Sequence, residues 1–432
     1  MSRKRIFIML FCAVFLLGSL QGCANQKSAE ASSQPINLQF WTLFGGGDAG
    51  YMKEIVDKFN RTHPNIHVKY MQLDFNQYYT KLVSGIAAGR SPDIAISHIT
   101  MMPELVHLGI LEPVDQIETF THASVPWNDF NQNILNSTVF DGKHYSLPID
   151  THPFVMFYNK KYLKDAGLLG TDDKPLIEKG PDGFIHFLEQ LKEKLPSNVA
   201  PFSFSNGGDD PYRLWWALYF QQGADGIVSK DLTRSAIDME KAVKAADYIK
   251  DLYFKYKVIP RNIADFYQMF QSQKAAITMT GVWATGTWSS TKGLDFGAMP
   301  IPNIYGTDVT WGDSHNLIFP IQAHPDPKRQ KATLTFAKFV VENGQIWANA
   351  GHVPADTINW TKKAFTTLPY RTEYTKVAST VAFPNQTAEF GGIKDLMIEN
   401  LDTIWNGSVS PKQAFKKLNR QINDLLKESI LN

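Results

Sequence analysis

The first folded part of the chain alternates between two spacings of apolar side chains. Residues 36–40 and 66–70 are apolar at every second position, which is the period of a half-buried β-strand. Residues 51–59 and 76–88 are apolar at positions three and four apart, which is the period of an amphipathic helix. A short apolar run at 93–96 follows a proline and favours a buried strand. The order strand–helix–strand–helix–strand predicts a mostly parallel sheet covered by helices.

The same two spacings recur later in the chain. Residues 242–253 and 336–340 have helical spacing, and residues 275–279 form an apolar strand. The last helix is expected to begin with Ser410 as its N-cap and Pro411 at its first position. Its expected buried face consists of Ala414, Leu418, Ile422 and Leu425. Because the 432 residues exceed the ~250–300 that one core usually serves, we expect two lobes.

The amino-terminal segment has the pattern of a secretory leader. Basic residues at 3–5 precede an unbroken apolar run at 6–17, which is shorter than the ~20 residues that a membrane-spanning helix needs. We therefore expect residues 1–22 to be a signal peptide that is removed. Cys23 follows the leader in a context that resembles the bacterial lipobox, in which this cysteine is lipidated. The alternative is an ordinary leader with an incidental cysteine.

Cleavage of the leader and lipidation of Cys23 would determine the cellular location of the protein. Cys12 would leave with the leader and Cys23 would carry palmitate, so the mature chain would have no free thiol and no disulfide. The polar residues 23–35 are typical of a flexible tether. We therefore expect a lipoprotein at the cell membrane, anchored by lipid on the extracytoplasmic face. No later segment is long and apolar enough to span a bilayer.

Charge and aromatic content narrow the class of ligand. Residues 1–22 hold three basic residues and no acidic one, so the remainder has 40 basic against 42 acidic residues. This balance argues against nucleic acid, which needs a basic surface. Aromatic residues make up 12% of the chain and ten of them are Trp. Since so many Trp are not easily all buried, we expect some to line a wet cleft.

Several aromatic residues stand beside short polar ones in predicted loops. The segments are 41–42 (WT), 210–212 (DPY), 281–283 (GVW) and 311–315 (WGDSH). Sugars need this mixture, because the apolar face of a pyranose packs on a ring while its hydroxyls bond to polar side chains. The alternative for each ring is a place in the core.

A glycine-rich segment at 45–50 (GGGDAG) matches the dinucleotide fingerprint G-x-G-x-x-G. We set this interpretation aside because nicotinamide cofactors are scarce outside the cell and Asp48 would face the pyrophosphate. The glycines would instead let the loop turn. Asp48 would either cap the following helix or face a ligand in the cleft.

Motifs of catalysis and metal binding are missing. The sequence has no H-E-x-x-H, no G-x-S-x-G and no reactive thiol, so we expect neither an enzyme nor a cofactor. The adjacent carboxylates at 209–210 could serve a glycosidase or bind calcium, but adjacency in sequence establishes neither. Four histidines are scattered along the chain, and we expect no metal site from them: His98, His152, His315 and His352.

Five segments, in this order behind a lipobox, carry a family resemblance. They are 40–42 (FWT), 89–94 (GRSPDI), 145–148 (YSLP), 157–160 (FYNK) and 273–283 (QKAAITMTGVW). Together they resemble the family 1 extracellular solute-binding proteins of ATP-binding-cassette (ABC) importers, in the class of maltose-binding protein. The resemblance spans nearly all of the mature chain.

The resemblance implies a type II periplasmic-binding-protein-like α/β fold, with a ligand cleft between two lobes joined by hinge crossovers. The expected lobe 1 is 36–148 plus 317–355, and lobe 2 is 150–312 plus 365–432. The expected crossovers lie near 149–152, 312–317 and 353–365.

The resemblance also implies ligand-binding positions. Trp283 corresponds to a ring-stacking Trp, Asp210 and Tyr212 to an acid–Pro–Tyr segment, and either Ser97 or His98 to a cleft group after the third strand. A Trp typical of maltose binders is missing, so the resemblance does not name maltose. The full expected set is Trp41, Asp48, His98, Asp150, His152, Asp210, Tyr212, Trp283, Trp311, Asp313, His315 and Phe390.

The implied function is capture of a sugar or oligosaccharide by hinge closure, followed by docking on ABC permease subunits with a separate ATPase. The implied receptor is a monomer. Two alternatives remain open at this point: an exported glycoside-active enzyme, and a binding protein for a solute that is not a sugar.

Overall fold

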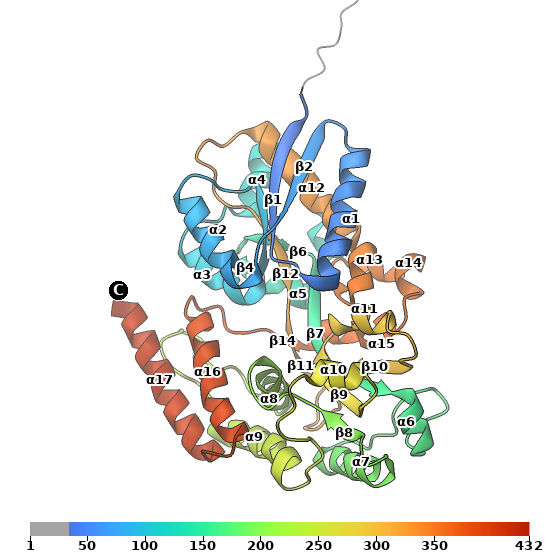
Figure 1. Cartoon of the computed structure of the whole chain (residues 1–432). Helices are drawn as coiled ribbons and strands as arrows, with labels where there is room; N and C mark the ends of the chain where they lie inside the picture. Colours follow the sequence, from blue (N-terminus) through green and yellow to red (C-terminus); the bar gives the residue numbers. More distant parts are fainter. Residues whose placement is uncertain (1–33, 432) are drawn as a thin grey trace, which may run out of the picture.

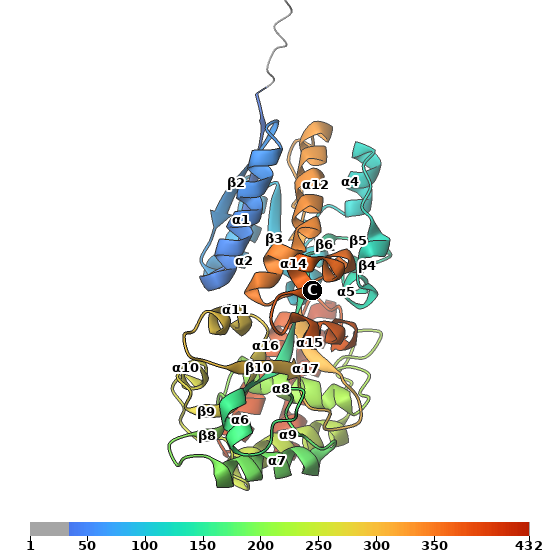
Figure 2. The ribbon, with the colours of Figure 1, turned by 90° about the vertical axis from the view of Figure 1, so that its right-hand side faces the viewer.

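Two β-sheets organise the chain, one in each of two lobes (Figures 1 and 2). The computed structural model describes residues 34–431, so the predicted leader, Cys23 and most of the predicted tether lie outside the described residues. Within residues 34–431, every helix is too short or too polar to cross a bilayer. The two-lobed α/β architecture confirms the predicted fold class.

The first lobe is built on a five-stranded sheet in the order β2-β1-β3-β12-β6. β1 pairs in parallel with β2 and β3, which confirms the predicted strand–helix–strand–helix–strand unit. The strands are β1 (Ile36–Thr42), β2 (Ile66–Gln72), β3 (Ile94–His98), β6 (Ser146–Pro148) and β12 (His315–Ile318). The main helices beside this sheet are α1 (Gly46–Thr62), α2 (Tyr78–Ala87) and α12 (Pro327–Glu342).

Helix α1 begins earlier than its apolar spacing indicates. Gly45 is the N-cap residue and makes no side-chain cap bond, so the prediction of Asp48 as N-cap is wrong. The glycines before Asp48 enter the helix, which moves its N-cap three residues earlier, from position 48 to position 45. Asp48 therefore lies in the first turn, where its charge is still favourable to the helix dipole.

The second lobe is built on the sheet β14-β11-β7-β9-β8, with β10 and β13 also paired to β7. Its strands are β7 (Asp150–Asn159), β8 (Ala200–Ser203), β9 (Ala275–Gly281), β10 (Phe296–Pro300), β11 (Thr310–Asp313), β13 (Val353–Pro354) and β14 (Val381–Ala382). Its main helices are α7 (Pro181–Lys194), α8 (Asp209–Gln221), α9 (Met239–Phe254), α10 (Phe266–Gln271), α16 (Phe390–Trp405) and α17 (Pro411–Leu431). Helix α17 starts at Pro411, as predicted.

The chain passes between the two sheets along neighbouring strands. β6 leads into β7 at residues 148–150, and β11 leads into β12 at 313–315. All ten residues of β7 are buried, and its first four pair with β13 and β11. The connections between the lobes therefore lie side by side, in the waist visible in Figure 1.

A buried carboxylate fastens the first sheet to its covering helix. Asp93, just before β3, accepts the backbone N–H of Gln39 in β1 at 2.7 Å. It also accepts Nε and Nη2 of Arg329 in α12, the latter at 2.8 Å. The Asp93 side chain is only 3% exposed, so its charge depends on these partners.

Replacing Asp93 by Ala is expected to lower the free energy of unfolding by about 1–3 kcal/mol, because the backbone N–H of Gln39 loses its buried acceptor, whereas the 40% exposed Arg329 side chain can be hydrated. Urea unfolding followed by Trp fluorescence measures this. The matched control is Asp57→Ala, which removes a solvent-exposed pair with Lys53 and should cost less than about 1 kcal/mol. Equal losses in the two variants would contradict the assigned role.

Candidate functional site

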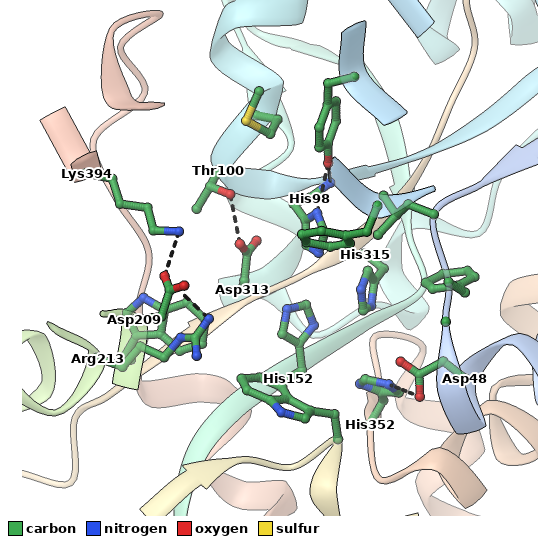
Figure 3. Close-up of a pocket in the computed structure, with 18 of the residues that line it drawn as sticks. Asp48, His98, Thr100, His152, Asp209, Arg213, Asp313, His315, His352 and Lys394 are labelled. Carbon is green, nitrogen blue, oxygen red and sulfur yellow. Dashed lines mark hydrogen bonds and ion pairs between the residues drawn. The ribbon is translucent and has the colours of Figure 1, made fainter. Parts of the chain in front are cut away.

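A cavity of about 540 Å³ lies between the lobes, beside the strands that connect them (Figure 3). This volume is within the roughly 300–1,000 Å³ typical of small-molecule sites. The first lobe contributes the β1–α1 loop, the start of α2 and the end of β3. The second contributes the start of α8, the segment just after β9, and helices α10 and α16. The connecting strands form the rest of the wall. The site is therefore shared by both lobes and by the segments that join them.

Most of the side chains expected from the sequence line this cavity. Loop ends and strand ends carry them, because those positions open toward the gap between the sheets. The predicted residues that line it are Asp48, His98, His152, Tyr212, Trp283, Trp311, Asp313 and His315.

Four predicted residues lie elsewhere. Trp41 points to the other side of β1, where it packs over Gly85 and lines a separate hollow. Phe390 is 2% exposed and lies in the core of the second lobe. Asp150 is fully buried beneath the cavity floor, and Asp210 is buried beside Arg213. Alternation of side chains along β1 places Trp41 on the face away from the cavity, and packing of α16 places Phe390 in the core. The position of a residue in a motif does not reveal either orientation.

Other cavity residues were not expected from the sequence. Arg213 follows Asp209 and Asp210 at helical spacing on α8, a signal that could have identified it. No such local signal identifies Lys394, because it lies on α16, far along the sequence from the other cavity residues. The lining residues that sequence reasoning did not select as ligand groups are Leu43, Phe44, Gly45, Phe75, Tyr79, Thr100, Met101, Asp209, Arg213, Tyr267, His352 and Lys394.

The second lobe presents an aromatic wall organised by Arg213. Its guanidinium lies 5.0 Å from the ring centroid of Trp283 and 4.7 Å from that of Trp311. The two indole rings are perpendicular, with centroids 6.4 Å apart. Tyr267 Oη accepts the Trp283 indole N–H at 2.8 Å. Asp210 Oδ1 accepts Nη1 of Arg213 at 2.8 Å and so fixes the guanidinium.

Two carboxylates of α8 differ in their surroundings. Burial raises the pKa of Asp210, only partly offset by Arg213. Burial acts in the same direction on Asp209, but Arg213 and Lys394 prevail and lower the pKa of Asp209. Lys394 Nζ lies 2.8 Å from Asp209 Oδ1. Asp209 is thus a charged group held at the cavity edge by two cations.

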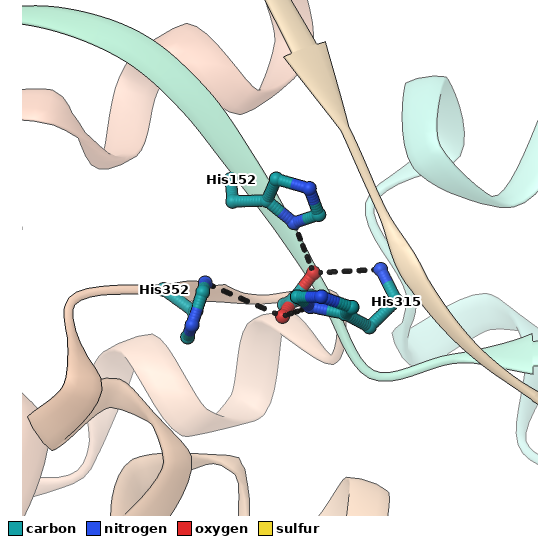
Figure 4. A group of neighbouring side chains, drawn as sticks. His152, His315 and His352 are labelled. Atoms are coloured by element: carbon teal, nitrogen blue, oxygen red, sulfur yellow. Dashed lines mark hydrogen bonds and ion pairs between the residues drawn. The ribbon is translucent and has the colours of Figure 1, made fainter. Parts of the chain in front are cut away.

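The connecting strands bring a group of histidines together around one carboxylate (Figure 4). Asp150 Oδ1 lies 3.1 Å from His152 Nδ1 and accepts the backbone N–H of His315 at 2.9 Å. Asp150 Oδ2 lies 2.8 Å from His315 Nδ1 and accepts the indole N–H of Trp347 at 2.6 Å. Three of the histidines that are scattered along the sequence thus meet in space, because β-pairing places distant segments side by side.

Charge in this group is distributed unevenly. Burial opposes ionisation of Asp150, but His315 and His352 prevail and hold the pKa of Asp150 well below its usual range. Burial also opposes the charge on His352, but Asp48 and Asp150 prevail and raise the pKa of His352. For His98 burial dominates and lowers its pKa to about 3. At the floor of the cavity the carboxylates therefore favour the charged form of His352, whereas burial favours the neutral forms of His98 and His152.

The carboxylates at the cavity surface already have partners within the protein, an ion-pair contact for Asp48 and hydrogen bonds for Asp313. Asp48 Oδ1 lies 3.3 Å from His352 Nε2. Asp313 accepts the backbone N–H of Ile99 at 3.0 Å and the hydroxyl of Thr100 at 2.8 Å. Such groups are suited to hold and orient a polar ligand in fixed positions.

Comparison with known proteins identifies relatives of this chain. Residues 45–346 match the family described as bacterial extracellular solute-binding protein. The maltodextrin-binding protein MdxE of Bacillus subtilis is 25% identical over 70% of this chain and 68% of its own length. The melibiose/raffinose/stachyose-binding protein MelE of the same organism is 20% identical over 99% of this chain and 98% of its own length. A binding protein of Brucella abortus is 28% identical, but this chain spans only 36% of its length.

Solved structures share the fold at low identity. The GacH receptor of Streptomyces glaucescens, solved unliganded and with acarbose, has a TM-score of 0.77 and 20% identity over 91% of this chain and 99% of that one. UgpB of Mycobacterium tuberculosis, in complex with glycerophosphocholine, has a TM-score of 0.78 and 17% identity over 92% of this chain and 100% of that one. The shared fold therefore accommodates different ligands.

Removing the Asp150 carboxylate is expected to lower the free energy of unfolding by about 3–5 kcal/mol, because Asp150→Ala leaves the Trp347 indole and the His315 backbone N–H without their buried acceptor. Urea unfolding checks this. Asp115→Ala is the control, since Asp115 pairs with His144 at a half-exposed position and should cost less than about 1 kcal/mol. A loss for Asp150→Ala no greater than that for Asp115→Ala would contradict its central role.

Proposed function

Because the chain belongs to the bacterial extracellular solute-binding protein family, we propose that it captures a sugar or oligosaccharide outside the cell and delivers it to an ABC permease. The observation that carries this proposal is the aromatic wall of Trp283 and Trp311, which lines the same cavity as the carboxylates of Asp48, Asp209 and Asp313. Relatives named for maltodextrin and for melibiose, raffinose and stachyose support the substrate class.

The wall has the two components that a sugar requires. The indole of Trp283 offers an apolar ring, and the Arg213 guanidinium beside it offers several N–H donors in fixed directions for hydroxyl groups. Asp48, Asp209 and Asp313 offer acceptors from both sides of the cavity. Rings and hydroxyl partners thus converge on one volume, which favours a polyol with an apolar face.

Capture proceeds by hinge closure in this proposal. The lobes rotate about the adjacent connecting strands near 149–152, 312–317 and 353–365, and water leaves the cavity as the two walls meet. The closed form docks on membrane permease subunits whose ATPase is a separate chain. Two relatives are named as binding proteins, which supports a receptor rather than an enzyme. In this proposal the receptor acts as a monomer.

A non-sugar solute is the second candidate. UgpB, which shares the fold, was solved with glycerophosphocholine. The cavity contains the cationic side chains of Arg213 and Lys394, although both pair with Asp209. A glycerophosphodiester is therefore the informative comparison ligand.

A thermal-shift screen tests the substrate class directly. The mature chain is heated with mono- and oligosaccharides, with glycerophosphocholine, calcium and amino acids as comparisons. A ligand at 100 times its Kd stabilises the native state by ~2.7 kcal/mol, which shifts the unfolding midpoint measurably. A sugar that shifts the midpoint and is recovered intact supports the proposal. A sugar that is cleaved supports an enzyme, and a shift only with glycerophosphocholine replaces the sugar.

Trp283→Ala is expected to weaken sugar binding by ~1–3 kcal/mol, because a desolvated ring in the cavity wall is lost. Isothermal calorimetry measures the change. Trp127→Ala is the control, since Trp127 stacks on His144 and is not among the residues lining the cavity. Equal affinity of the Trp283→Ala variant and the unsubstituted protein would remove Trp283 from the site.

Cys23→Ala is expected to move the protein from the membrane fraction to the medium or periplasm, because the lipid that anchors it can no longer be attached. Fractionation and mass spectrometry of the amino terminus measure this. Membrane retention of the Cys23→Ala chain to the extent of the unsubstituted chain would contradict lipid anchoring at this residue.

A further inference from the structure

We propose that His152, His315, His352 and Asp150 bind a transition-metal ion of the zinc class at the floor of the cavity. The four residues come from three separate segments: the start of β7, the start of β12 and the residue before β13. The three histidines also line the cavity, so an ion can reach them from solvent. The proposal does not depend on which solute the cavity binds.

The spacing of the ligand atoms is close to that of a tetrahedral site. One nitrogen or oxygen from each residue lies within 4.8 Å of the others. Ligands bound to zinc at 2.0–2.1 Å stand about 3.4 Å apart, so only a small inward movement is needed. The imidazole centroids are 4.3 Å apart for His152–His315, 5.3 Å for His315–His352 and 5.7 Å for His152–His352. Two imidazoles on one tetrahedral zinc ion have centroids about 5 Å apart.

The surroundings of His352 provide an independent observation. This side chain is 1% exposed, yet neither ring nitrogen makes a hydrogen bond. The nearest carboxylate oxygens, Asp48 Oδ1 and Asp150 Oδ2, lie 3.3 Å and 3.6 Å away without hydrogen-bond geometry. A buried polar group without a partner is costly, and a metal ion would satisfy one nitrogen of the ring.

Neighbouring groups hold the ligands in place. The Trp347 indole stacks on the His352 ring, with centroids 4.7 Å apart and planes 9° apart. Its N–H binds Asp150 at 2.6 Å. Asp48 lies beside the Nε2 atom of His352 and can accept a hydrogen bond from the N–H of that ring when the other nitrogen binds the ion. Carboxylates in this position orient metal-bound histidines in known sites.

The donor set indicates the class of metal. Imidazole with a single carboxylate suits zinc and the neighbouring late transition metals. Calcium and magnesium prefer shells made entirely of oxygen, so they should not bind here. An ion at this point would tie together the three segments that connect the lobes.

Metal titration of the mature chain, without a polyhistidine tag and after chelator treatment, tests the proposal. Calorimetry with Zn²⁺ should show one ion bound per chain, and Co²⁺ should give the visible absorption bands of a tetrahedral site. Ca²⁺ should do neither. Absence of stoichiometric Zn²⁺ binding together with absence of the Co²⁺ bands overturns the proposal, and indicates that the histidines only neutralise Asp150.

Substitutions locate the ion. His152→Gln and His352→Gln should each weaken Zn²⁺ binding by at least about 10-fold. His144→Gln is the matched control, because His144 also pairs with a carboxylate, Asp115, but lies away from the cavity. Affinity unchanged in both cavity variants places the ion elsewhere and overturns the proposal. Circular dichroism of the metal-free variants establishes folding, and the Co²⁺ spectrum of the unsubstituted chain remains decisive if they do not fold.

The sugar screen and the metal titration fail independently. Zn²⁺ binding without any sugar response leaves the metal site standing and removes the substrate class. A sugar response without Zn²⁺ binding supports the substrate class and removes the metal site.

Discussion

One buried carboxylate determines how the lobes are joined. Asp150 begins β7 and accepts bonds from the backbone of His315 and the indole of Trp347. These donors come from segments 165 and 197 positions further along the chain. A charge in this position is stable only when its partners are present, because desolvation alone would be prohibitive. The Asp150 carboxylate therefore interacts with the strands that connect the lobes, with the cavity floor and with the histidine group.

The aromatic wall is also organised around one charged side chain, in this case a cation. Arg213 is a partly buried cation at the cavity wall, in contact with two indole rings and the carboxylate of Asp210. Asp209 and Lys394 extend this arrangement to the rim. The cavity is consequently neither a simple apolar pocket nor a simple charged one. Each polar group has a fixed direction before any ligand arrives, which reduces the ordering that binding requires.

Local pattern was enough to predict the parallel unit of residues 36–96, the family resemblance implied the two-lobed fold, and neither predicted the floor of the site. The strand and helix periods of residues 36–96 depend on near neighbours, so they are visible in sequence and are confirmed. The grouping of His152, His315 and His352 depends on β-pairing between distant segments, which no short window contains. Trp41 shows a further limit of sequence-based prediction. Strand alternation shows which residues share a face of β1, but not which of the two faces borders the cavity. Arg213 was accessible from its spacing to Asp210 on α8 and was overlooked.

Strand β7 has a mechanical consequence. It is buried along its whole length and is hydrogen-bonded first to β13 and β11, then to β9 and β10. The junction between the lobes is thus a laddered ribbon and not a loose linker. A change in the angle between the lobes, as the proposed hinge closure requires, would bend this ribbon while its backbone hydrogen bonds remain in place. In that case the residues that move would also be residues whose amides are protected from exchange with water.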